Sequence, residues 1–256
     1  MIVSLKFPDL DSMYLCNLVQ SLGQQHSHGS PLNHSSTHGW FWDVKPINKN
    51  ALKSHTAARS ETMDVFPWHT DCSYAVEPPR FFGLQVLQAD KCGGGTLSVL
   101  SLEKVLPNLS KEAIETLHAE EFRIEVPPEF QNGAEFTTGS LLLSEGEGYR
   151  DFQHTLCRYR DDITHPLTER AERALKEISN VLKHARNGSN ECLNLTAQMI
   201  PNGSVVLIDN RRWLHARNEI HDPERHLRRI RWDAREFQNR ESLRTSQFQK
   251  FERNHS

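Results

Sequence analysis

The sequence lacks the features that mark several protein classes. No apolar run approaches the ~18 residues of a membrane-spanning helix. The five cysteines form no CxxC pair, which disfavours a zinc ribbon and a redox dithiol. Basic residues are not in excess, since 30 Lys and Arg face 33 Asp and Glu, so no charge signature of nucleic-acid binding is present. The HExxH, GxSxG and P-loop motifs of zinc proteases, serine hydrolases and nucleotide-binding proteins are also absent.

The remaining composition is that of a globular protein. The 256 residues suit one large domain or at most two small ones, and 37% are hydrophobic while 25% carry charges of both signs. Scattered cysteines, odd in number, favour a reducing compartment. Lys6 and Asp9 interrupt the N-terminus too early for a secretory signal. We therefore expect a cytoplasmic protein that acts on a small molecule, not on nucleic acid or a membrane, with an oligomeric state that the sequence leaves open.

A strand-rich body lies between two polar segments. Residues 21–39 are rich in Ser and His and read as a loop, while residues 239–256 read as a polar tail. Apolar residues alternate with polar ones in four segments that we predict as strands: 122–126, 193–199, 204–208 and 227–232. The pattern divides the chain into an N-terminal segment (1–62), a core (63–238) and the tail (239–256).

Two helices are predicted inside the core, within an insert at about 101–190. Ser110 caps the first, and Thr168 caps the second, which Gly188 would end. The second helix carries an apolar stripe suited to packing on a sheet: Ala171, Ala174, Leu175, Ile178, Val181 and Leu182. Strands that flank such an insert favour a mainly β fold, a sandwich or jelly roll with peripheral helices.

The densest chemical signal is the segment FPWHTD at residues 66–71. If it is a strand, His69 and Asp71 point to the same face, where an imidazole and a carboxylate form two thirds of a metal site. Chance alone produces about 0.7 His-x-Asp tripeptides in a chain of this composition. A plain His–Asp hydrogen bond therefore explains this motif about equally well when it is taken alone.

A histidine far along the chain completes a candidate site. His215 follows the apolar run at residues 205–208 and a charged turn. Two His and one carboxylate occupy one face of Fe(II) and leave the other face open for substrate and O2. Zinc more often takes three His, or two His with Glu.

Two further segments carry residues suited to anions. In residues 225–232, Arg225, Leu227, Arg229 and Arg231 share one strand face, and an inward-facing Arg requires a carboxylate. An exposed edge strand protected by charge is the simpler reading of this segment alone. In residues 92–97 three glycines precede Thr96, whose hydroxyl would stand at a strand start, although an ordinary β-turn has the same pattern.

Together these segments resemble the taurine dioxygenase-like (TauD/TfdA) family of Fe(II)- and 2-oxoglutarate-dependent oxygenases. The resemblance covers about residues 63–233 and rests on five segments in the family's order: WHTD, PPRFFGLQVL, GGGTLSV, VVLIDNRRWLHAR and RHLRR. It implies a double-stranded β-helix core, which is a jelly roll of the cupin type. It also implies a non-haem dioxygenase that uses Fe(II), 2-oxoglutarate and O2.

The resemblance assigns roles to six residues. Iron ligands are His69, Asp71 and His215; 2-oxoglutarate ligands are Thr96 and Arg225; a ligand for an acidic group of the prime substrate is Arg229. The implied reaction oxidises a C–H bond of a small acidic molecule, usually by hydroxylation, while 2-oxoglutarate is decarboxylated to succinate.

The role of Arg229 also has an argument from geometry. Strand rise separates its Cα atom from that of Arg225 by about 13 Å, so the two guanidiniums serve different groups. A buried, unpaired Arg is costly, and its partner is either an unidentified protein carboxylate or the substrate. The resemblance favours the substrate.

Two other functions remain open at this point. A non-catalytic jelly-roll protein could retain the metal pocket without turnover, and the 68 residues before His69, fewer than expected for the family, favour it. A zinc hydrolase would need neither 2-oxoglutarate nor O2.

Overall fold

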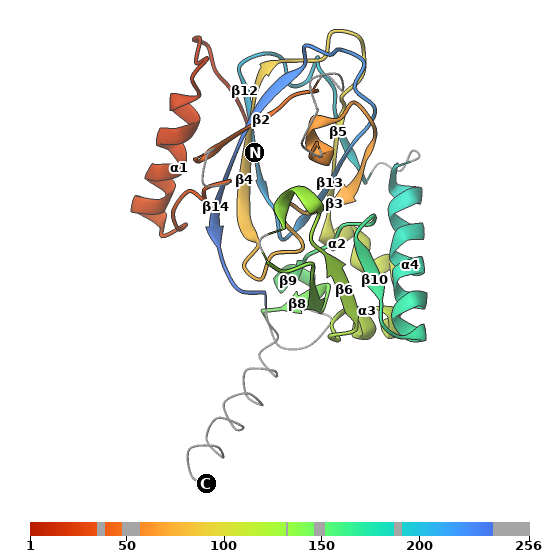
Figure 1. The fold of residues 1–256 in the computed structure, drawn as a ribbon. Coiled ribbons are helices and arrows are strands. Elements are labelled where there is room, and N and C mark those ends of the chain that lie inside the picture. Colours follow the sequence, from red (N-terminus) through yellow and green to blue (C-terminus); the bar gives the residue numbers. More distant parts are fainter. Residues whose placement is uncertain (35–38, 48–56, 132, 146–151, 187–190, 238–256) are drawn as a thin grey trace, which may run out of the picture.

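Two antiparallel sheets form the body of the protein in the computed structural model, which describes residues 1–34, 39–47, 57–131, 133–145, 152–186 and 191–237 (Figure 1). The larger sheet has the order β1-β12-β4-β14-β2, with bounds Ile2–Ser4, Ser204–Asp209, Pro79–Gln88, His226–Ala234 and Phe41–Val44. The smaller has the order β11-β5-β13-β3, with bounds Leu193–Leu195, Leu97–Ser101, Trp213–Arg217 and Phe66–His69. Strands distant in sequence are thus neighbours, as in a jelly roll.

The two sheets enclose an apolar core. One buried cluster joins Phe82 and Leu84 of β4 and Leu227 of β14 to Leu97 and Val99 of β5. Inward residues alternate with outward ones along each strand. The apolar residues whose alternation predicted the strands therefore pack between the two sheets. The expected mainly β fold with a double-stranded β-helix core is confirmed.

One helix covers the outer face of the larger sheet. The helix α1 (Met13–His26) places Leu15 and Val19 against Val205, Ile230 and Trp232 (Figure 1). The prediction of a loop from residue 21 is therefore wrong for residues 21–26, because the apolar face of this helix packs on the sheet and overrides the polar composition. Residues 35–38 of that predicted loop lie outside the described residues.

The predicted insert holds both helices and small sheets. Its helices are α2 (Leu102–Val105), η3 (Leu106–Asn108), α3 (Lys111–Leu117), η4 (Pro128–Phe130), η5 (Phe152–His154) and α4 (Glu169–Arg186). Its strands are β6 (Phe122–Glu125), β7 (Phe136–Gly139), β8 (Leu142–Ser144), β9 (Thr155–Cys157) and β10 (Thr164–Pro166). A short 3-10 helix, η2 (Arg59–Glu61), precedes β3. Figure 1 shows α3 and α4 on the side of the molecule away from α1.

Both predicted helix caps are confirmed. The Ser110 hydroxyl accepts a hydrogen bond from the Ala113 N–H, and the Thr168 hydroxyl accepts one from the Ala171 N–H. The stripe of α4 packs into a cluster with Phe122 of β6. Gly188 lies outside the described residues, as does the whole of the predicted tail. None of the helices in the part of the chain that the structure describes combines the length and apolar character of a membrane span.

Three of the four predicted strands form as expected, namely β6, β12 and β14. The fourth is shorter, because β11 ends at Leu195. The N–H groups of Met199 and Ile200 donate to the Thr196 carbonyl and close a turn instead. A short alternating pattern does not distinguish these two outcomes.

Candidate metal centre and cosubstrate pocket

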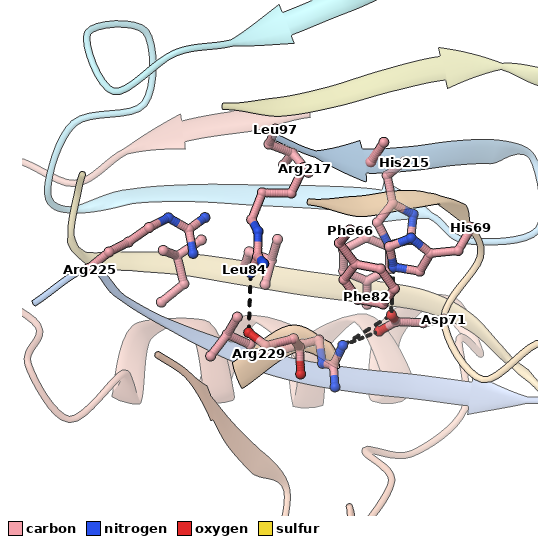
Figure 2. Close-up of a pocket in the computed structure, with 14 residues that line it drawn as sticks. Phe66, His69, Asp71, Phe82, Leu84, Leu97, His215, Arg217, Arg225 and Arg229 are labelled. Atoms are coloured by element: carbon pink, nitrogen blue, oxygen red, sulfur yellow. Dashed lines mark hydrogen bonds and ion pairs between the residues drawn. The ribbon is translucent and has the colours of Figure 1, made fainter. Parts of the chain in front are cut away.

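The three predicted metal ligands converge from two strands and one turn. His69 is the last residue of β3, and His215 lies opposite it on the neighbouring strand β13. The strand has ended before Asp71, so this carboxylate reaches the site from the following turn. Figure 2 shows the two imidazoles and the carboxylate pointing toward one another.

The distances are those of a ligand set around one point. The His69 Nε2 and His215 Nε2 atoms lie 3.8 and 3.7 Å from the Asp71 Oδ1 atom, and the ligand atoms of all three residues lie within 4.8 Å of one another. All three residues are buried. Two neutral imidazoles and one carboxylate are a donor set that suits Fe(II), so these residues fit the metal that the resemblance implies.

The local structure orients each ligand. The Nδ1 atom of His69 lies 2.8 Å from the Pro67 carbonyl oxygen; when Nδ1 carries the proton and donates, the Nε2 lone pair is free for a metal. Burial, followed by the nearby His215, holds the pKa of His69 well below its ordinary value. The imidazole is therefore neutral, as metal binding requires.

Asn210 holds the backbone of the turn that carries Asp71. Its side-chain oxygen accepts from the Asp71 N–H at 2.7 Å, and its amide nitrogen donates to the carbonyls of Asp71 and Pro79 at 3.0 and 2.8 Å. Asn210 is 1% exposed. Nothing in the sequence assigned Asn210 a role, because sequence spacing alone does not indicate a hydrogen bond across 139 residues.

Arg229 forms a buried ion pair with Asp71. Its Nη1 atom lies 2.9 Å from Oδ2 and 3.0 Å from Oδ1 of the carboxylate. Burial alone would raise the pKa of Asp71, but Arg229 and then His215 and His69 hold it well below its ordinary value. The argument that an unpaired Arg229 requires an acidic substrate is therefore wrong, because the protein itself supplies the carboxylate.

Arg225 lies at the opposite end of the same pocket from the metal ligands (Figure 2). It is 5% exposed, its Nη2 donates a long hydrogen bond of 3.5 Å to the Gly95 carbonyl, and its Nη1 has no hydrogen-bond partner in the described part of the chain. Among the described residues no carboxylate is within ion-pair distance of it. Burial lowers its pKa to about 10, although Asp90 opposes the shift. This guanidinium is available to an anion that enters the pocket.

Thr96 follows Gly95, which contacts this arginine, but Thr96 is not in the lining of the pocket. The next residue, Leu97, lines it instead, and the Thr96 backbone is held by Asn218 through its N–H and its carbonyl. Gly95, with φ +67°, brings the loop against Arg225: a Cβ atom there would lie 2.6 Å from the Arg225 Nε. The glycine is therefore required for the close approach.

Arg217 also lines the pocket, and sequence reasoning missed it. It points inward two residues after His215, and its Nη2 donates to the carbonyls of Thr62 and Asp64 at 2.8 and 2.6 Å. Burial, with the nearby Arg225, lowers its pKa to about 9. Because residues two apart on a strand point to the same face, the predicted inward direction of His215 would also have indicated that the Arg217 side chain points inward.

Comparison with known proteins agrees with this geometry. The profile described as "Taurine catabolism dioxygenase TauD, TfdA family" matches residues 7–231. An L-asparagine oxygenase of Streptomyces coelicolor is 30% identical over 157 residues, which are 61% of this chain and 43% of the relative. The chain thus spans less than half the length of that protein.

Solved structures share the fold. A structure of asparagine oxygenase with Fe(II), 2S,3S-3-hydroxyasparagine and succinate has a TM-score of 0.66 at 23% identity, over 91% of this chain and 67% of the other. A structure of the non-heme iron oxygenase OrfP with Fe and alpha-ketoglutaric acid has a TM-score of 0.65 at 20% identity, over 87% and 64%. Since the profile match covers most of the sequence, including all the converging residues described above, the chain belongs to the taurine catabolism dioxygenase TauD, TfdA family.

Proposed function

We propose that this protein is a non-haem Fe(II)- and 2-oxoglutarate-dependent dioxygenase that hydroxylates a C–H bond of a small, amino-acid-like molecule. The overall reaction consumes the substrate, 2-oxoglutarate and O2, and it yields the hydroxylated product, succinate and CO2. One atom of O2 enters the product and the other enters succinate.

The observation that carries this proposal is the arrangement of two kinds of site in one pocket. A buried ligand set of His69, Asp71 and His215 lies at one end, and the buried, unpaired cation of Arg225 lies at the other. A ligand set alone would equally suit a metal hydrolase. A cation beyond it suits a cosubstrate that binds the metal at one end and carries a carboxylate at the other.

Each residue of the pocket has a defined task in this proposal. When bound, iron and 2-oxoglutarate supply the O2 activation and the C–H oxidation. His69, Asp71 and His215 hold the metal, and Arg225 holds the far carboxylate of the cosubstrate. Thr96 would add a hydrogen bond to that carboxylate, which requires its hydroxyl to turn toward Arg225. Arg229 keeps the Asp71 carboxylate ionised and in place.

The class of substrate follows from the relatives and from the charge of the site. The solved asparagine oxygenase is in complex with 2S,3S-3-hydroxyasparagine, and a mutant of the non-heme iron oxygenase OrfP is in complex with (3S)-hydroxy-L-Arg. These are small molecules with a carboxylate. The buried cation of Arg231, which lines a cavity with Asp71, supports an acidic group on the substrate of this protein as well.

We also propose that the protein acts in the cytoplasm, without nucleic acid or a membrane as partner. The net charge of -3 and the five free cysteines support this setting.

The test is an oxygen-labelling experiment. Protein loaded with Fe(II) and 2-oxoglutarate without air is mixed with single L-amino acids and then given isotopically labelled O2. We expect one amino acid to gain one labelled oxygen atom while succinate forms in equal amount. Binding of Fe(II) and 2-oxoglutarate with no succinate under any condition would instead favour a non-catalytic binding protein. Hydrolysis that needs neither O2 nor 2-oxoglutarate would favour a zinc enzyme.

A further inference from the structure

A second cavity adjoins the metal ligands on the side away from Arg225. It shares His69, Asp71 and Arg229 with the metal pocket and continues past them to Cys72, Tyr74, Phe130, Arg160 and Arg231. Its empty space is about 380 Å³, part of which is open to solvent. We call it the Arg231 cavity.

Three of the four arginines that line this cavity have partners within the protein. Arg59 donates to the Val65 carbonyl through Nε and Nη2 at 3.2 and 2.8 Å. Arg160 forms a bidentate pair with Asp162, with distances of 2.7 and 2.9 Å. Arg229 is paired with Asp71, as described above.

Arg231 differs from Arg160 and Arg229 because no carboxylate of the described residues pairs with it, and it differs from Arg59 because it is buried. It is 8% exposed, its Nη1 donates to the Sγ atom of Cys72, and its Nε has no hydrogen-bond partner among the residues that the structure describes. No carboxylate of the described residues lies within ion-pair distance of it. Asp71 is near enough to help Cys72 and Tyr74 raise its pKa against the effect of burial, but the oxygens of Asp71 already serve Arg229.

A charge count shows what the loaded site would lack. A divalent metal and the dianion of 2-oxoglutarate cancel each other, and the pairs Arg229–Asp71 and Arg160–Asp162 are each neutral. Arg225 then adds one positive charge at the far end of the pocket. The cation of Arg231 is then left beside the metal ligands with only a thiol as its close partner, and a buried Arg in that state favours an anionic ligand.

We propose that Arg231 binds the carboxylate of the prime substrate in this cavity, while Arg229 remains paired with Asp71. The inference rests on the proposed function for the identity of that substrate. Tyr74 and Phe130 stack with ring centroids 5.8 Å apart at 16° and present an apolar wall to the rest of the molecule. The substrate is therefore a monocarboxylate or amino acid whose charged end lies at Arg231 and whose body lies between this wall and the metal.

Binding can be measured without turnover. Protein loaded with Mn(II) and 2-oxoglutarate in the absence of O2 is titrated calorimetrically with L-asparagine, L-aspartate, L-arginine and L-asparaginamide, which lacks the carboxylate. We expect at least one of the three acids to bind and the amide to bind more weakly. If Mn(II) and 2-oxoglutarate bind but none of the three acids does, the proposal is overturned.

Variants of β14 then separate Arg231 from its neighbours. Arg231→Gln should weaken binding of the acid by about 30-fold or more, because one partner of a buried charged contact is removed. Arg231→Lys should restore part of the affinity. Both should keep the wild-type affinity for Mn(II) and 2-oxoglutarate. Arg228→Gln is the matched control, because Arg228 lies on the same strand but pairs with Asp43 outside the cavity, and it should bind the acid normally. Unchanged binding by Arg231→Gln would refute the assignment.

A stability measurement needs neither metal nor substrate. Arg231→Met should leave the Tm of the ligand-free protein unchanged or higher, since a cation without a carboxylate is lost, whereas Arg160→Met breaks an ion pair and should lower it. Equal losses of Tm in both variants would count against the proposal. If wild-type protein binds no Mn(II) or 2-oxoglutarate, the proposed function fails by itself, and this comparison still decides whether Arg231 is an unsatisfied cation.

Discussion

The Nη1 atom of Arg229 lies 2.9 and 3.0 Å from the two carboxylate oxygens of Asp71. A residue predicted to bind substrate and a residue predicted to bind iron therefore form one buried ion pair. The pair keeps Asp71 ionised in a site from which water is largely excluded, so a metal meets a carboxylate that has no proton to lose.

Breaking this pair should be costly in metal-free protein. Arg229→Leu leaves the buried carboxylate of Asp71 without its cation and should reduce the free energy of unfolding by roughly 3–5 kcal/mol. Saturating Mn(II) should restore part of the loss, because the metal supplies a new positive charge. Urea unfolding with and without Mn(II) measures both effects. A variant as stable as wild type without metal would show that the ion pair contributes little.

The cosubstrate end of the pocket depends on Arg225. Arg225→Ala should raise the concentration of 2-oxoglutarate needed for half-saturation by orders of magnitude, since a buried charged contact is worth about 2–5 kcal/mol when one partner is removed. Thr96→Val should cost nearer ~1 kcal/mol, as expected for one hydrogen bond from a neutral donor. Calorimetric titration with 2-oxoglutarate measures both. If Arg225→Ala binds 2-oxoglutarate with wild-type affinity, the cosubstrate does not bind at this end of the pocket.

The loop beside Arg225 should respond to acid. Burial would raise the pKa of Asp90, but the N–H groups of His221, Asp222, Cys92 and Gly94 donate to its carboxylate and bring the pKa below its ordinary value. A lowered folded-state pKa contributes stability that is present above the unfolded value of about 3.9 and is lost as the pH falls through the folded value.

Asp90→Asn therefore provides a direct comparison. Wild type should exceed the variant in unfolding free energy by a constant amount above about pH 5, and the difference should shrink below about pH 4. Urea unfolding from pH 3 to pH 7 follows it. A difference that stays constant down to pH 3 would exclude Asp90 as its source.

The metal ligands should be indispensable for metal binding. His69→Ala leaves two ligands on one face, which hold a labile divalent ion poorly, so stoichiometric binding of Fe(II) or Mn(II) should be lost. Metal analysis after gel filtration without air measures it, and circular dichroism checks that the fold is kept. One equivalent of metal retained by the variant would contradict the ligand assignment.

The sequence indicated the ligands better than it indicated their surroundings. The convergence of His69, Asp71 and His215 could be predicted because the motifs stand in the family's order, although His215 is 144 residues from Asp71 in the chain. Strand alternation placed Arg225 and Arg229 on the inner face, as the pocket lining confirms. The partner of Arg229 could not be found in this way, because Asp71 is in a turn and only the folded register brings it there.

Propensity and composition failed where tertiary packing decided the outcome. The polar residues that begin at Ser21 continue a helix, because Leu15 and Val19 of α1 are buried against the sheet. The surroundings of Arg231 could likewise not be predicted from the sequence. Its position on the strand indicated the direction of its side chain. Only the folded structure shows that no carboxylate of the described residues pairs with Arg231, whereas Asp162 pairs with Arg160 in the same cavity.

The most direct test of the central claim measures succinate formed from 2-oxoglutarate by wild type and by His215→Ala. With Fe(II), O2 and a mixture of L-amino acids, wild type should form succinate at a rate that falls to background when Fe(II), O2 or 2-oxoglutarate is left out. His215→Ala should remain at background throughout. Succinate formed equally by the variant, or none formed by metal-loaded wild type, would contradict an oxygenase centred on His69, Asp71 and His215.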